Sequence, residues 1–307
     1  MRRIIIPLIA FLFLGTTLNS MPKTVLPADK ETKETKKEVR KARDRYLWLG
    51  YGFSFSSVLD QATSPLIYKG FNFANASLGY LIHSDRIIST LELDFAYNNL
   101  KSRTSSPWYD PRNTSYIPTI RYNRLFKIKS IKNKVNWYVG PEFNINMNFR
   151  VDYKFGNSAF TFDSYAGIGA ATRFEIPFSW QGKKVKIWFM KFNRHDRDLR
   201  FSWQLSMPLV SMMVRPTYVT ITNFIDPDQQ SALRQEHITG GVIVPFAIRS
   251  QAGLYYTLHN QNMLKLGYVW NFMSHDPGYN KVQTAFHGVQ LAFVFKFNNK
   301  TLSNKLR

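Results

Sequence analysis

The sequence predicts an all-β protein: a closed antiparallel transmembrane β-barrel of about ten strands, with twelve as the alternative count. Aromatic residues make up 16% of the 307 residues, yet the mean hydropathy is slightly negative, so apolar and polar residues must alternate finely. Residues 135–149 show this alternation over an unusual length, from Val135 to Phe149. The polar faces of the predicted strands also carry charges in mid-strand. Such charged side chains can lie inside a barrel whose interior is polar.

The first 20 residues have the order of a secretory signal peptide. Arg2 and Arg3 precede an apolar run from Ile4 to Leu14, and small and polar residues follow. The run is too short to span a bilayer. We therefore expect export with cleavage near residue 20, and an uncleaved anchor is the alternative because Ser20 and its neighbours fit the cleavage rule poorly.

Residues 21–45 form a charged segment with almost no apolar face. Eight lysines and arginines between Lys30 and Arg45 are mixed with acidic residues. Such a segment cannot bury a core, so we expect a solvated periplasmic linker or a short charged helix. It is also the candidate docking segment for a periplasmic or outer-membrane partner.

The barrel is predicted to cover residues 46–298, and residues 299–307 form a basic tail. Period-two alternation marks each strand in turn, with apolar faces of roughly ten residues, the length a tilted strand needs to cross a hydrocarbon layer. We expect ten strands if two of them are interrupted. The expected strands are 46–56, 66–81, 90–98, 116–123, 135–149, 160–176, 185–211 (interrupted), 238–259 (interrupted), the strand after a turn at 259–262, and a last strand ending at Phe297.

Loop lengths and prolines add detail to this prediction. The connections 101–115 and 223–237 are long and polar, whereas 83–86 and 259–262 are short, so we expect long loops at one end and most short turns at the other. Residues 183–200 fit a strand, a large turn, or both. Pro118 and Pro141 lie on apolar faces, where a missing ladder donor predicts a bulge or a lost ladder bond.

Seven charged residues fall on the polar faces of the predicted strands. A soluble sandwich would use shorter strands and an apolar interior. Because both signs are present, we expect these side chains to pair inside a narrow lumen while the apolar faces meet lipid. The predicted lumen charge cluster is Glu92, Asp94, Arg121, Glu142, Arg173, Glu175 and Arg200.

The formal net charge of +21 raises the question of an anionic partner. No helical basic stripe, zinc motif or RNP-like block occurs, so we do not expect nucleic acid. Phosphates of membrane lipids match the charge better. The predicted lipid-phosphate contacts are Lys127, Lys129, Lys132, Lys134, Lys183 and Lys184, with a solvated charged flank as the equal alternative. The predicted membrane-interface aromatics are Trp137, Trp188 and Trp270.

The residues favour a protein that is not an enzyme. The absence of cysteine excludes disulfides and thiolate chemistry. Six histidines are scattered over turns and strand ends, and none pairs with a serine on a strand face. Residues 195–198, HDRD, hold one histidine only, too few for a typical metal site. We predict no catalytic residue, no metal and no cofactor, and Glu92 with Asp94 is interpreted as an arginine-paired couple rather than an acid–base pair.

From Tyr46 to Phe297 the chain resembles the outer-membrane β-barrel proteins of Gram-negative bacteria. The stretches LIYKGFNF, MKFNRHD and NKVQTAFHGVQLAFVFKF are similar to those of small Bacteroidota barrels. The resemblance implies an outer-membrane monomer that contacts membrane lipids, with lipopolysaccharide as a further candidate, in a structural, binding or accessory transport role. The alternatives are a rim-located hydrolase of lipid or peptide and a soluble periplasmic β-domain. The basic tail after Phe297 departs from the usual aromatic C-terminus.

Overall fold

The computed structural model describes most of the predicted barrel. The predicted signal peptide 1–20, the linker up to residue 43 and the tail 299–307 lie outside the described residues. The described ranges are 44–102, 111–131, 134–152, 160–180, 184–187, 190–193, 197–215, 238–278 and 280–297.

In these ranges, no helix has the length and apolar character needed to cross a membrane.

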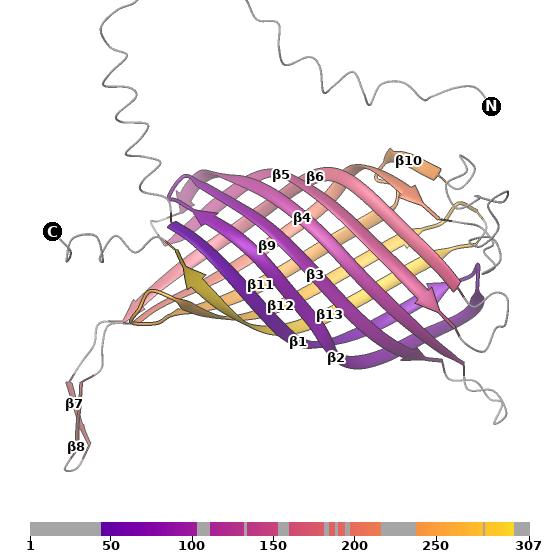
Figure 1. The fold of residues 1–307 in the computed structure, drawn as a ribbon. Helices are drawn as coiled ribbons and strands as arrows, with labels where there is room; N and C mark the ends of the chain where they lie inside the picture. The colour runs from indigo at the N-terminus through magenta and orange to yellow at the C-terminus, as the bar shows by residue number, and fades with distance from the viewer. Residues whose placement is uncertain are drawn as a thin grey trace, which may run out of the picture. The chain divides into compact units, whose positions relative to one another are not determined.

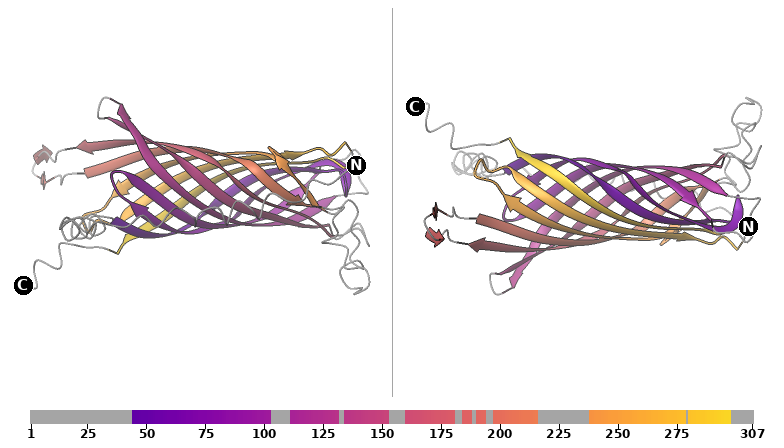
Figure 2. Two further views of the ribbon diagram at one scale, coloured as in Figure 1. Left: turned by 90° about the horizontal axis from the view of Figure 1, so that it is seen from above. Right: turned by 90° about the horizontal axis from the view of Figure 1, so that it is seen from below.

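Ten antiparallel strands form one closed barrel, as the sequence predicts (Figure 1 and Figure 2). Consecutive strands pair around the ring, β13 pairs with β1, and β6 pairs with β9, so the ring has no open seam. The barrel strands are β1 (Asp44–Asp60), β2 (Ser64–His83), β3 (Ile87–Lys101), β4 (Arg112–Ile131), β5 (Val135–Val151), β6 (Phe160–Trp180), β9 (Arg197–Val214), β11 (Phe246–Thr257), β12 (Met263–His275) and β13 (Val282–Lys296). β1 begins two residues before the predicted barrel start.

The two strands predicted to be interrupted behave differently. β10 (Ile238–Val242) pairs with 210–214 of β9, and β11 pairs with 199–206 of the same strand, so 238–257 is one interrupted strand, as predicted. The prediction for 185–211 is wrong in its first part. β7 (Lys184–Ile187) and β8 (Met190–Asn193) pair with each other in a separate two-stranded sheet, and β9 begins only at Arg197.

The two ends of the barrel carry different connections. At the terminal end, where β1 starts and β13 finishes, the turns 84–86 and 258–262 are short. The long connections after β3 and β9 leave from the opposite, distal end, as predicted. Three connections depart from this asymmetry. At the distal end, 61–63 and 276–281 are short. At the terminal end, the connection between β6 and β9 is long because it includes β7 and β8.

Pro118 and Pro141 interrupt the β4–β5 ladder without a bulge. Thr119 pairs with Asn146 and Tyr116 with Phe149, and the register is the same on both sides of Pro118. The pairs Asn123–Glu142 and Phe126–Val139 likewise keep one register across Pro141. Because proline lacks an N–H, the ladder loses a bond at each position while the strands stay aligned. A register shift occurs nearby, between Lys127 and Lys129.

Side chains alternate between an apolar outer wall and an inner face that carries most of the buried polar and charged residues. On the outer wall Leu49, Phe73 and Ile168 expose 63%, 68% and 63% of their surface. On the inner face Asn98 and Asp163 are fully buried. This is the reverse of a soluble sandwich, whose apolar side chains fill the interior.

Aromatic and aliphatic side chains fill the lumen toward the terminal end. Trp48 of β1 is 4% exposed and lies against Gly79, its register partner on β2. The ammonium of Lys265 lies 5.0 Å from the indole ring of Trp48 and 5.7 Å from the ring of Tyr255. The buried cluster at this level is Tyr46, Trp48, Leu81, Ile88, Leu125, Tyr138, Ala171, Tyr255, Met263, Ala292 and Val294.

Substituting Gly79→Ala should destabilise the barrel, because the added Cβ would lie 2.0 Å from an indole carbon of Trp48. Overpacking of this kind costs about 1–3 kcal/mol of unfolding free energy. Gly240→Ala is the matched control, since the nearest heavy atom to its added Cβ is 3.6 Å away. Denaturant unfolding in lipid vesicles, followed by tryptophan fluorescence, measures both. Equal unfolding free energies for the two variants would contradict this packing.

Candidate functional site

A charge network crosses the lumen at mid-barrel. Glu92 and Asp94 both face inward because they are two residues apart on β3. Arg121 of β4 is the register partner of Glu92, and its Nη2 lies 2.8 Å from Glu92 Oε2 and also contacts the Asp94 carboxylate. Glu92 and Arg121 are 5% and 4% exposed. The three side chains form one buried ion-pair group.

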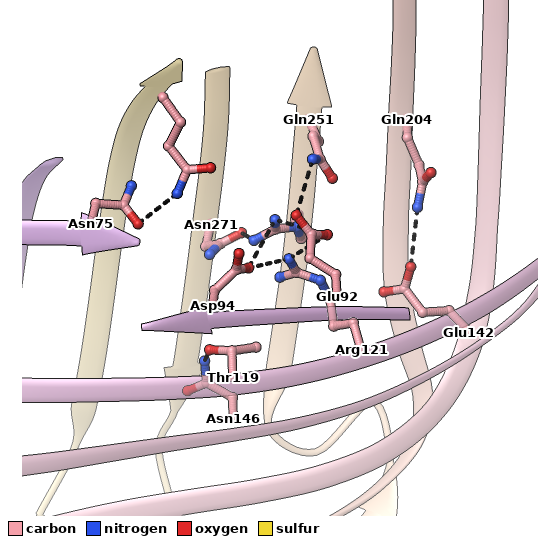
Figure 3. Close-up of polar contacts among 12 residues, drawn as sticks. Asn75, Glu92, Asp94, Thr119, Arg121, Glu142, Asn146, Gln204, Gln251 and Asn271 are labelled. Atoms are coloured by element: carbon pink, nitrogen blue, oxygen red, sulfur yellow. Dashed lines mark hydrogen bonds and ion pairs between the residues drawn. The ribbon is translucent and has the colours of Figure 1, made fainter. Parts of the chain in front are cut away.

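The opposite wall of the barrel completes this network (Figure 3). Arg249 of β11 places Nη2 3.6 Å from Asp94 Oδ2, and its Nη1 donates to Asn271 at 2.9 Å. Gln251 Nε2 donates to Glu92 Oε1 at 3.4 Å. Because β3 and β11 lie on opposite sides of the ring, these contacts bridge the lumen. We call Glu92, Asp94, Arg121 and Arg249 the central network.

Glu142 lies beside the central network rather than within its ion pairs. Its side chain is 5% exposed and accepts a hydrogen bond from Gln204 Nε2 at 3.2 Å (Figure 3). The amide partner lets a carboxylate remain in a narrow interior.

The remaining three predicted lumen charges form a second group toward the terminal end. Arg173 Nη2 lies 2.8 Å from Glu175 Oε1, and Glu175 Oε2 lies 3.0 Å from His83 Nε2. Arg200 Nη1 is 3.1 Å from the same histidine nitrogen, and its guanidinium lies over the ring of Tyr255. The structure thus places all seven predicted charges on the inner face, in two groups instead of one.

A third charge group near the distal end was missed by the sequence analysis. Asp60 accepts from Arg150 Nη2 and from Arg215 Nη2, both at 2.6 Å, and Arg150 also contacts Asp163. These residues lie at strand ends, where alternation is least distinct. Arg249 and Lys265 were missed too, although Arg249 and Gln251 alternate with Phe246, Ile248 and Leu254 in the sequence.

The central network lies between two small cavities. The distal cavity, about 70 Å³, is lined by Asp94, Arg121 and Arg249 and by apolar residues such as Ile248 and Met273. The cavity toward the terminal end, about 20 Å³, is lined by Glu92, Gln251 and Lys265. A water needs roughly 10–15 Å³ of such volume, so the two spaces hold a few waters each at most. Beside the central network, these two spaces leave little free volume between the described side chains.

Two of the predicted interface aromatics lie on the outer wall. Trp137 donates from Nε1 to Thr172 Oγ1 at 2.7 Å and stacks on Phe174 with ring centroids 5.8 Å apart. Phe174 stacks in turn on Trp203 at 5.9 Å, an aromatic row across three strands that the sequence analysis did not identify. Trp270 is half-buried on β12. Trp188 lies outside the described residues.

The predicted lipid-phosphate lysines are only partly described. Lys127 is half-buried, and Lys129 and Lys134 are exposed, all at the terminal end of β4 and β5. Lys132 and Lys183 lie outside the described residues. Lys184 begins β7, and its side chain is not described.

The described residues offer no catalytic or metal-binding constellation. No group of three His, Asp or Glu side chains that could hold a metal ion occurs among them. His287 on the outer wall is hydrogen-bonded to the Tyr268 hydroxyl at 2.8 Å, with no serine joined to it in the described ranges. In HDRD, residues 195–196 lie outside the described part of the chain.

No family model matches the sequence, and no curated protein matches it. Three similar solved structures are outer-membrane β-barrel proteins. The autotransporter NalP translocator domain from Neisseria meningitidis is 4% identical, with a TM-score of 0.34, over 87% of this chain and 97% of its own. Neisserial surface protein A is 10% identical, with a TM-score of 0.27, over 82% of this chain and 97% of its own. Ail of Yersinia pestis is 10% identical, with a TM-score of 0.28, over 82% of this chain and 99% of its own. Because the TM-scores are low, these likenesses carry no argument about this chain. Its fold is described from its own strand pairing.

Substituting Arg121→Met should lower the unfolding free energy by about 3–5 kcal/mol, because it leaves Glu92 and Asp94 buried without their arginine. The quadruple variant Glu92→Gln, Asp94→Asn, Arg121→Met, Arg249→Met should recover part of this loss, since it removes both carboxylates together with the two arginines that pair with them. Lys129→Met, an exposed substitution of the same kind, is the control. Denaturant unfolding in vesicles measures all three, and an Arg121→Met variant as stable as the control would refute the network's role.

Proposed function

We propose that this chain is an outer-membrane β-barrel protein with a closed, charged lumen, acting in a structural, binding or accessory transport role rather than as an open pore or an enzyme. The observation that carries the proposal is the apolar outer wall around a polar interior. More than 60% of the residue surface is exposed at Leu49, Ile168 and Leu291. Other apolar side chains are exposed on the same three strands. Soluble monomers rarely expose continuous apolar surface of this kind.

Closure and strand length support a membrane location. Hydrocarbon cannot hydrogen-bond a free strand edge, and the β6–β9 pairing removes that edge. Nine of the ten barrel strands have 13–21 residues, and β11 has 12. A tilted strand needs about 9–11 residues to cross the hydrocarbon layer. A soluble periplasmic domain would have to cover this wall by other means.

The sidedness of the barrel follows from its even strand count. Both ends of the barrel sequence meet at the terminal end, where Tyr46 pairs with Lys296. In bacterial barrels of this type the termini and short turns are periplasmic. We therefore assign the terminal end to the periplasm and the distal end to the cell exterior. The cleaved signal peptide, the Bacteroidota origin, the monomeric state and contact with lipopolysaccharide remain predictions.

The filled lumen favours roles other than diffusion through the barrel. Small barrels are packed by their interior side chains. Here Trp48, Tyr138 and Tyr255 occupy the terminal side, and the central network bridges the middle. A scaffold of this kind can present its distal loops or its outer wall to a partner while it keeps the membrane sealed.

In planar lipid bilayers the wild-type chain should show no stable conductance steps. The double variant Trp48→Ala, Tyr255→Ala should produce steps, because it removes two aromatic side chains that fill the lumen. The matched control is Phe53→Ala, Phe71→Ala, which removes two rings from the outer wall. Open-pore conductance of the wild type would overturn the closed lumen, and recovery of the protein in the soluble periplasmic fraction would overturn the membrane location.

A further inference from the structure

A hollow of about 280 Å³ lies on the outer wall near the terminal end, across β2, β3 and β4. Strand register gives it an ordered lining: Ile82, Ser89 and Arg124 form one row across the three strands. The small Ser89 between two larger neighbours lets the wall recede at this point. The lining residues are Tyr80, Ile82, Ser84, Ile87, Ser89, Leu91, Tyr122 and Arg124.

Arg124 is an unusual residue for an outer wall that faces lipid. Its side chain is exposed, and its guanidinium carbon lies 5.6 Å from the ring centroid of Phe126. Among the ion pairs of the described residues, none involves Arg124. A guanidinium presents five N–H donors in a fork that fits a phosphate. In an apolar surrounding such a charge calls for an anionic partner.

The wall next to Arg124 becomes apolar toward the middle of the barrel. The row beyond Arg124 is Tyr80, Leu91 and Tyr122, and the next is Leu78, Leu93 and Ile120. Leu91, Leu93 and Ile120 are 42%, 41% and 40% exposed. Rows two residues apart are separated by roughly 7 Å along a strand. The hollow therefore has a cationic end on its terminal side and an apolar track that runs from it toward the middle of the barrel.

Two basic residues and one acidic residue lie on the rim beside the hollow. Arg86 in the β2–β3 turn and Lys129 of β4 are exposed, and so is Asp85, next to Arg86. The backbone N–H of Lys127 donates to the Arg86 carbonyl at 2.9 Å, which fixes the turn against β4. Basic residues near a membrane surface attract anionic headgroups.

We propose that this hollow binds a membrane glycerophospholipid of the leaflet at the terminal end, with Arg124 on the lipid phosphate and an acyl chain along Leu91 and Leu93. Hydroxyl groups of Ser89, Tyr80 and Tyr122 line the same hollow and are donors of the kind that phosphate oxygens accept. The proposal rests on the proposed membrane location. It places the phosphate on Arg124, farther along β4 toward the middle of the barrel than Lys129 of the lysine flank predicted from the sequence.

Native mass spectrometry of the full chain, released from detergent after incubation with phosphatidylglycerol, tests the proposal. Wild type should retain one phosphatidylglycerol and should not retain diacylglycerol of the same chain length. Arg124→Gln should weaken retention about tenfold or more, because hydrogen bonds to charged groups contribute about 1.5–3 kcal/mol. Ser89→Leu should also lose the lipid, since it fills the hollow while Arg124 remains.

Lys69→Gln is the matched control, because it removes one exposed positive charge from β2 at the distal end of the barrel, outside the hollow. Equal retention by wild type and Arg124→Gln, or an equal loss in Lys69→Gln, would overturn the proposal. Binding of diacylglycerol as strong as that of phosphatidylglycerol would also overturn the proposal, because it would show that the hollow does not recognise the phosphate. Inorganic phosphate that binds alone and displaces the lipid would make it a free-anion site and would also overturn the proposal.

The two proposals can fail separately. Heat-modifiable migration on gels reports a folded barrel for each variant, and recovery in the outer-membrane fraction reports its location. If both hold while the lipid is not retained, only the lipid site is wrong. If the chain is recovered in the soluble periplasm, the membrane location itself is wrong.

Discussion

The pairing of β6 with β9 completes a ring of backbone hydrogen bonds on which the rest of the structure depends. Their register runs from Ser164–Val214 to Trp180–Arg197, and without it both strands would present open edges. Hydrocarbon offers no substitute for those bonds. In the closed ring, side chains at odd and even positions of a strand face opposite sides. The apolar side chains of the alternating pattern therefore form the outer wall, and the charged side chains lie in the lumen.

The narrow interior then decides what the charged set does. Charges that cannot reach bulk water need partners, and they find them in three groups at different heights. The ladder register and these ion pairs support each other, because a one-residue slip of β4 would turn Arg121 toward lipid and leave Glu92 and Asp94 without it. Buried ion pairs add little net stability but penalise wrong pairings strongly. We therefore interpret the central network as a device that fixes register and closes the lumen.

Period-two alternation predicted most of this architecture. It predicted about ten strands, the inner and outer faces, an interrupted strand over 238–259, which the structure has over 238–257, and seven inward charges. It could not separate β7–β8 from β9, because local alternation does not specify the partner strand. It also could not predict cross-lumen contacts such as Glu92–Gln251, 159 residues apart, since these depend on which strands face each other after closure. Pro118 and Pro141 cost ladder bonds but no register shift, because the neighbouring pairs on both sides keep the alignment.

Site-directed spin labelling can show whether the apolar outer wall meets lipid, and the absence of native cysteine removes background labelling. Labels would replace Leu49, Ile168 and Leu291 on the outer wall and Ser56, Asn144 and Gln290 on the inner face, in the chain reconstituted into vesicles. If the outer wall meets lipid, the outer-wall labels should collide with molecular oxygen far more than with a water-soluble nickel chelate, and the inner labels should not share this preference. Outer-wall labels that collide mainly with the nickel chelate would contradict it.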